Sequence, residues 1–129
     1  MSLDVSLKDP TAKYCGCTLY DANITHNLAG MASEAGLYDA LWRPYRLLDG
    51  YREMDYEKER EFEDSHKVFA RDIISVIENG LNDLKARPDH FRKFDSPNGW
   101  GTYENFVPFV EEYLCAKRSY PDAIVETNI

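Results

Sequence analysis

Apolar residues recur at helical spacing in the first half of the chain. A first helix is predicted to begin at Asn23 or Thr25, since either side chain can cap exposed backbone N–H groups. Gly36 is a suitable C-terminal cap for it. The residues expected on its buried face are Ile24, Leu28, Met31, Ala32 and Ala35. A short helical segment, 37–42, should follow and end before Pro44, because a residue that precedes proline is disfavoured in the α region.

The longest apolar pattern predicts one helix over 57–86. Its expected seam keeps a period of about 3.6 residues and consists of Phe62, Phe69, Ile73, Val76, Ile77, Leu81 and Leu84. Gly80 lies inside this pattern, where glycine costs about 1 kcal/mol relative to alanine. Close approach of a neighbouring helix would explain a glycine there. Pro88 follows the helix and can open a short helical turn over 89–94.

The two ends of the chain show weaker patterns. Residues 1–20 are expected to form an irregular arm, and residues 120–129 a frayed tail or, less favoured, an edge strand. A last helix should run to Lys117 and be capped by Thr102 or Asn105. Asn105 is preferred, because Pro108 would then fall in the first turn. The pattern as a whole predicts a single all-α domain over 1–129, a compact bundle of three to five helices.

Charge is concentrated in one part of the chain. The formal net charge is −8, and residues 49–64 hold eight acidic and three basic residues. This acidic segment is interpreted as a solvated helical face; an acidic decoy for a basic partner is the alternative. The remainder is nearly balanced in charge, so no nucleic-acid partner is expected.

Other features narrow the setting of the protein. No apolar run approaches the roughly 20 residues of a membrane-spanning helix, and the N-terminus lacks a signal-peptide pattern. Three cysteines, an odd number, favour a reducing cytoplasm. Cys15, Cys17 and His26 are a weak zinc candidate, since their spacing matches no standard site. No metal or cofactor is therefore expected.

The candidate chemistry lies in two polar corners and one arginine. The corner with the most distinctive residues follows a Ser96-Pro97 turn and holds the ligand-binding candidates Asn98, Gly99, Trp100, Gly101 and Tyr103. Trp100 would offer a stacking surface, and Asn98 and the glycine N–H groups would donate hydrogen bonds. A purely structural turn, with Trp100 closing the end of the bundle, is the alternative.

The other corner opens the predicted first helix and could meet the first in space. Its candidates are Asn23, Thr25, His26 and Asn27. At a helix N-terminus these residues would favour an anion, although ordinary capping explains two of them equally well. Trp42 and Arg43 are further candidates, because an arginine held between tryptophan and proline can pair with a carboxylate or phosphate. A surface arginine stacked at a helix end is the alternative there.

These motifs together resemble a group of small uncharacterised proteins encoded in phages and prophages. The resemblance covers about Tyr20 to Ala116 and is carried by Asn-Ile-Thr-His-Asn-Leu at 23–28, Leu-Trp-Arg-Pro at 41–44 and Asn-Gly-Trp-Gly-x-Tyr at 98–103. It implies an accessory protein acting in a bacterial cytoplasm, in which the acidic segment 49–64 is an insertion. It implies no particular reaction.

The expected function is that of a non-enzymatic binding module. Its partner would be a small polar or anionic ligand or a host protein, with no role for a membrane. The nine tyrosines are compatible with a homodimer. The alternatives are a small hydrolase with His26 as base, oriented by Asp21 or an asparagine, and the acidic decoy named above.

Overall fold

The computed structural model describes residues 2–11 and 17–129. Along the chain, the elements are β1 (Ser2–Lys8), β2 (Thr18–Thr25), the 3₁₀ helix η1 (His26–Leu28), α1 (Ala29–Glu34), α2 (Tyr38–Trp42), the 3₁₀ helix η2 (Pro44–Leu47), α3 (Tyr56–Ser65), β3 (Val68–Phe69), α4 (Ala70–Ala86), α5 (Pro88–Arg92), α6 (Tyr103–Ser119) and β4 (Ile124–Asn128).

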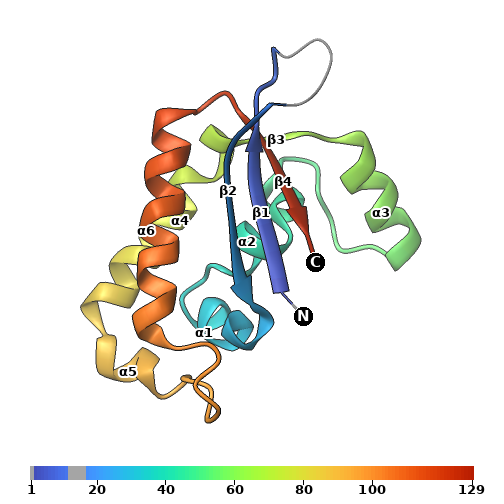
Figure 1. The fold of residues 1–129 in the computed structure, drawn as a ribbon. Coiled ribbons are helices and arrows are strands. Elements are labelled where there is room, and N and C mark those ends of the chain that lie inside the picture. The colour runs from blue at the N-terminus through green and yellow to red at the C-terminus, as the bar shows by residue number, and fades with distance from the viewer. Residues whose placement is uncertain (1, 12–16) are drawn as a thin grey trace.

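The protein is a mixed α and β structure, so the predicted all-α bundle is wrong. Four strands form one antiparallel sheet in the order β2-β1-β4-β3. Both ends of the chain enter this sheet, and β1 lies beside β4 at its centre (Figure 1). The described part of the expected irregular arm is thus a strand, and the expected frayed tail is an interior strand.

The sheet has one apolar and one polar face. Leu3, Val5 and Leu7 alternate along β1 and are buried, whereas Asp4 and Ser6 between them face the other way. On β2, Tyr20, Ala22 and Ile24 stand opposite those three buried residues. This period-two pattern is short, and it becomes stable only when partners distant in sequence pair with it. For that reason the strands are harder to recognise in the sequence than the helical repeats are.

The predicted helix over 57–86 is two helices with a strand between them. Val68 and Phe69 pair with Val125 and Ile124 of β4, and this pairing extends the backbone where the helix was expected to continue. The Phe69 N–H then donates to the Asp72 carboxylate at 2.9 Å, which caps the start of α4. The break is therefore caused by a pairing with residues more than fifty positions away.

Two helix starts fall on one of the two positions that the sequence offered for each. β2 continues through Ile24 to Thr25, and Thr25 caps the three-residue helix η1 by accepting the N–H of Asn27 at 3.3 Å. α6 begins at Tyr103 with Thr102 at the N-cap position, which was the less favoured alternative, so Pro108 lies inside the helix. Because proline has no N–H, the Glu104 carbonyl lacks the hydrogen bond that a regular helix would provide.

The remaining helical predictions hold. Leu28, Met31 and Ala32 are buried, as the helical pattern indicated. Gly36 follows α1 with a positive φ of 72°, α2 ends before Pro44, and α5 opens at Pro88. Within the described ranges, none of the helices is both long and apolar enough to cross a membrane.

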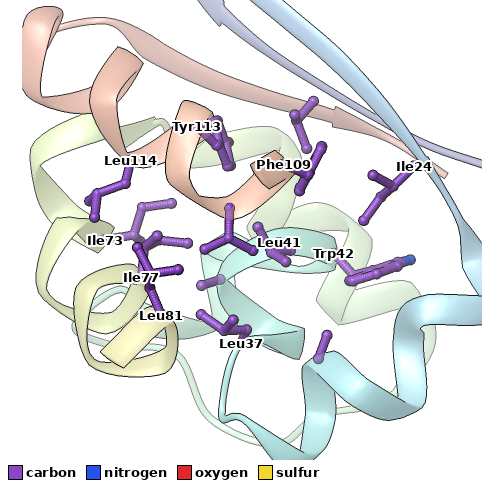
Figure 2. Packing of buried hydrophobic residues seen from close by; sticks show 14 of the residues in the cluster. Ile24, Leu37, Leu41, Trp42, Ile73, Ile77, Leu81, Phe109, Tyr113 and Leu114 are labelled. Atoms are coloured by element: carbon purple, nitrogen blue, oxygen red, sulfur yellow. The ribbon is translucent and has the colours of Figure 1, made fainter. Parts of the chain in front are cut away.

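The core lies between the apolar face of the sheet and the helices α2, α4 and α6. Figure 2 shows Leu37 and Leu41 near the buried residues Ile73, Ile77 and Leu81 of α4. Gly80 of α4 meets Leu37 directly: a Cβ added there would lie 2.3 Å from Leu37 Cδ2. The close approach that the sequence predicted for Gly80 is confirmed.

We expect Gly80→Ala to lower the free energy of unfolding by up to about 2 kcal/mol. Overpacking against the fully buried Leu37 costs typically 1–3 kcal/mol, and the better helix propensity of alanine returns about 1 kcal/mol. Urea denaturation measures the difference. Gly30→Ala is the control, because its added Cβ would meet nothing closer than 3.9 Å; equal stability of the two variants would contradict the packing argument.

Candidate functional site

The two polar corners meet and form one side of a surface groove. The groove has a volume of about 780 Å³ and lies where the end of β2, the loop 96–101 and α6 come together. This volume is within the usual range of ligand sites. The residues that line it are Ser2, Ala22, Asn23, Ile24, Thr25, Asn27, Leu28, Asn98, Gly99, Trp100, Gly101, Asn105, Pro108, Phe109 and Glu112.

The loop 96–101 is closed by its own hydrogen bonds. The Ser96 N–H donates to the Gly101 carbonyl at 2.9 Å, and the Gly99 N–H donates to the Ser96 carbonyl at 3.0 Å. The Asn98 Oδ1 atom accepts from the Trp100 N–H at 2.9 Å and from the Ser96 hydroxyl at 2.6 Å. Asn98 therefore uses its carbonyl oxygen to hold the loop, and only its amide nitrogen is left for a ligand.

The loop is fixed onto η1 by a hydrogen bond and by close packing. Asn27 Nδ2 donates to the Trp100 carbonyl at 2.8 Å. Gly101 has a φ of 107°, and a Cβ added there would lie 3.0 Å from Asn27 Cβ and 3.1 Å from Thr25 Cγ2. Only glycine fits this position without movement, since the backbone conformation and the contact both exclude a side chain.

Trp100 is the most exposed aromatic side chain in the described part of the chain, at 71%. It is held at the edge of the groove by the closed loop beneath it. A tryptophan ring is the largest apolar surface that a side chain can offer, and leaving it in water without a partner is unfavourable. The alternative in which Trp100 closes the end of a bundle is inconsistent with this exposure.

The opposite wall is a stripe along α6 that the sequence reasoning missed. Asn105, Pro108, Phe109 and Glu112 have the i, i+3, i+4, i+7 spacing of one helix face. Asn105, Pro108 and Glu112 are exposed, whereas Phe109 is buried and forms part of the floor with Ile24 and Leu28. An exposed proline inside a helix was the available signal, but the misplaced start at Asn105 concealed it.

The groove combines apolar surface with uncharged polar groups. Four asparagines and Thr25 supply amide and hydroxyl groups, and Glu112 is the one ionisable side chain among the described residues of the lining. Glu112 makes no ion pair with another described residue. Some of the polar groups have internal partners, since Asn23 Nδ2 donates to Asp4 across the sheet. With no lysine, arginine or histidine among the described residues that line it, the groove offers an anion no opposite charge there.

His26 and Trp42 lie together but away from the groove. The indole N–H of Trp42 donates to His26 Nδ1 at 3.0 Å, and Trp42 is only 2% exposed. This bond fixes the tautomer, because an accepting Nδ1 leaves the ring proton on Nε2. His26 Nε2 is enclosed and has no partner among the described residues. Both side chains therefore belong to the interior.

Tyr103 and Arg43 are also outside the groove. The Tyr103 hydroxyl donates to the Leu84 carbonyl at 2.8 Å, so this side chain ties α6 to α4 within the core. Arg43 lines a separate hollow near the C-terminal end of β4, together with Arg46 and Glu59. The structure therefore brings together Asn23, Thr25, Asn27, Asn98, Gly99, Trp100 and Gly101, and leaves out His26, Trp42, Arg43 and Tyr103.

The acidic segment 49–64 holds α3, which has no buried residue. One of its acids is nevertheless engaged: Glu59 accepts from the Tyr45 hydroxyl and from Arg46 Nε, each at 2.7 Å. The hydrogen bond from Tyr45, followed by those from Arg46, lowers the pKa of Glu59. Glu59 therefore anchors α3 to η2 and is not free for a partner.

Metal binding gains no support from the described residues. No group of three or more histidine, cysteine, aspartate or glutamate side chains is placed there to hold an ion. The zinc candidate involved Cys15, which lies outside the described residues.

A second unusual group of polar atoms lies at the other end of α6. Lys117 is fully buried, and its Nζ atom lies 4.1 Å from the centre of the Tyr113 ring, which in turn stacks on Tyr20 at 6.0 Å. Lys117 Nζ and both tyrosine hydroxyls are buried without a hydrogen-bond partner among the described residues. Burial lowers the pKa of Lys117 to about 7 and raises that of Tyr113.

We expect Gly101→Ala to destabilise the protein by about 2 kcal/mol or more, through backbone strain and the contact with η1. Gly99→Ala is the matched control. It also has a positive φ, 77°, but its added Cβ would meet nothing within 4 Å. Thermal denaturation should therefore show a larger loss for Gly101→Ala, and equal losses would indicate that the loop does not press on η1.

We expect protein stability to rise with pH above neutrality because of Lys117. Its folded-state pKa of about 7 lies below the ordinary value of 10.5, so the unfolded chain binds more protons between these limits. Lys117→Met should stabilise the protein at pH 7, on the order of a few kcal/mol, and the gain should shrink toward pH 10. Urea denaturation at several pH values tests this; a gain that does not change with pH would contradict it.

Comparison of the chain with protein-family models, with curated proteins and with solved structures gives no match. The resemblance to small phage and prophage proteins therefore stays a prediction. The proposed function is therefore based on the residues that line the groove.

Proposed function

We propose that this protein is a non-enzymatic binding module whose groove between β2, loop 96–101 and α6 holds its partner. One observation carries the proposal: the Trp100 ring is 71% exposed at the edge of a groove with asparagine side chains on its walls and apolar side chains on its floor. An aromatic face beside directed amide groups is a usual composition of a binding site.

The electrostatics of the groove favour an uncharged polar partner or one with a positive charge. Glu112 is the one ionisable side chain in the described part of the lining, and the protein as a whole has a net charge of −8. Of the ligand classes that the sequence suggested, an uncharged polar molecule or a protein segment fits this charge distribution better than an anion does.

The two alternatives have less support. A general base must reach the substrate proton directly or through a water molecule, but His26 Nδ1 is occupied by Trp42 and His26 Nε2 is enclosed. An acidic decoy would rest on charge alone, since α3 buries no residue and Glu59 is already held by Tyr45 and Arg46, whereas the groove combines an exposed aromatic ring with directed amide groups. We therefore favour binding over hydrolysis and over charge mimicry.

The proposed setting follows from the sequence. A phage or prophage accessory protein in a bacterial cytoplasm would use such a groove to hold a small polar molecule or a segment of a host protein. A homodimer remains compatible with this proposal, because the groove is built within one chain.

Binding in the groove should depend on Trp100 and should be visible in its fluorescence. The chain has two tryptophans, and Trp42 is buried, so acrylamide should quench mainly Trp100 in the free protein. A panel of nucleosides, oligosaccharides, amino acids and short peptides is tested for compounds that reduce this quenching. For each such compound, Trp100→Ala should weaken binding at least about tenfold, as loss of a large aromatic contact does.

Trp100→Ala should leave the fold nearly intact, since most of its side chain is in water. Far-UV circular dichroism and thermal denaturation check this point. Tyr38→Ala is the comparison variant for an aromatic residue outside the groove: Tyr38 stacks on Trp42 at 5.3 Å and takes no part in the lining. If every compound bound the Trp100→Ala variant as tightly as the wild type, the groove would not be the binding site.

A further inference from the structure

We propose that the partner held in the groove is an extended polypeptide segment, which adds as a strand to the outer edge of β2 at residues 22–25 and places a basic side chain near Glu112. This inference rests on the proposed function of the groove and identifies the class of partner. Addition of a peptide strand to a sheet edge is an established mode of recognition.

The position of β2 in the sheet favours strand addition. The strand order β2-β1-β4-β3 places β2 at one edge, so within the described residues β1 is its one partner. Every second residue of an edge strand directs its N–H and C=O away from the sheet, and these groups are free to pair. Edges are often protected by lysine or proline, but residues 22–25 are Ala-Asn-Ile-Thr.

The groove follows the outer edge of β2. Ala22, Asn23, Ile24 and Thr25 all line it, although alternate residues of a strand point to opposite faces of the sheet. A surface that includes four consecutive residues must pass around the edge of the strand, where the backbone is accessible. A small ligand on one face of the sheet would not need this shape, whereas an added strand would.

α6 lies on the other side of the space beside this edge. α6 runs alongside β2 (Figure 1). Its stripe of Asn105, Pro108 and Glu112 lines the same groove as residues 22–25. A strand added in the groove would therefore lie between β2 and α6. A single extended segment needs only this space, whereas a second copy of the whole sheet would also have to be accommodated beside α6, so a peptide is favoured over a dimer formed through this edge.

Charge and side-chain chemistry indicate the character of the peptide. Glu112 is exposed and makes no ion pair within the described chain, and Asp21 lies on β2 directly before residues 22–25, where the peptide would add. A lysine or arginine of the peptide would neutralise Glu112. Trp100, at the end of the groove near Thr25 and Asn27, would cover an apolar or aromatic side chain of the same peptide.

The test begins with selection of binders from a displayed library of random linear twelve-residue peptides on the immobilised protein. The selected peptides are synthesised with a fluorescent label, and their Kd values are measured by anisotropy. Each peptide is then remade in a series in which one backbone nitrogen at a time is methylated. Methylation removes an N–H donor and blocks strand pairing at that residue, but it leaves the side chain in place.

Strand addition predicts an alternating result. Methylation at every second residue over a stretch of about four should weaken binding about tenfold or more, and methylation between these positions should have little effect. Glu112→Gln should weaken binding of peptides that contain lysine or arginine and should reduce its salt dependence. Glu61→Gln, an exposed glutamate of α3 outside the groove, removes the same charge and should leave Kd unchanged.

The outcomes separate this inference from the proposed function. Peptides whose binding depends on Trp100 but shows no alternation under methylation would overturn strand addition and leave the groove as a binding site. The same conclusion would follow if no peptide were selected and a saccharide or nucleoside bound in a Trp100-dependent way. A dimer that masks the β2 edge, detected by native mass spectrometry, would also overturn the inference. If no probe showed dependence on Trp100, both proposals would fail.

Discussion

The pairing of β1 with β4 is the interaction on which the rest of the structure depends. It joins residues from the two ends of the chain and completes a sheet whose apolar face is made by short alternating segments such as Leu3, Val5 and Leu7. None of these strands could bury its apolar side chains alone. Once the sheet is formed, α2, α4 and α6 have a surface to cover, and the core between them closes.

The groove is a consequence of this arrangement. Because β1 pairs with β4 on one side, β2 is left at the edge of the sheet, and the chain turns from β2 directly into η1. The loop 96–101 then packs on η1 through Gly101 and through the bond from Asn27 to the Trp100 carbonyl. α6 starts just after that loop and returns beside β2. The edge strand, the loop and the helix therefore enclose a surface that no single element provides.

The site and the core have different requirements for polar groups. In the groove, amide side chains face solvent and are partly used to hold the loop, as Asn98 does. In the interior, the few polar atoms are enclosed: His26 accepts from Trp42, and Lys117 lies over Tyr113 without a hydrogen-bond partner among the described residues. An unpaired buried amine is costly when charged. The protein thus keeps Lys117 in the core at the expense of stability near neutral pH.

Sequence alone determined the local features of this protein. The helical repeat identified α2, α5 and most of the buried residues of α1 and α4, because a helix is stabilised by contacts between neighbours in sequence. It also singled out the two corners that meet, since turn-forming glycine and exposed asparagine have local signatures. Tertiary structure decided the sheet, the break at Val68 and Phe69, and the separation of His26 and Arg43 from Trp100. These features arise from pairing between residues far apart in the chain, and a short alternating segment shows its preference for the strand only when its partner is present.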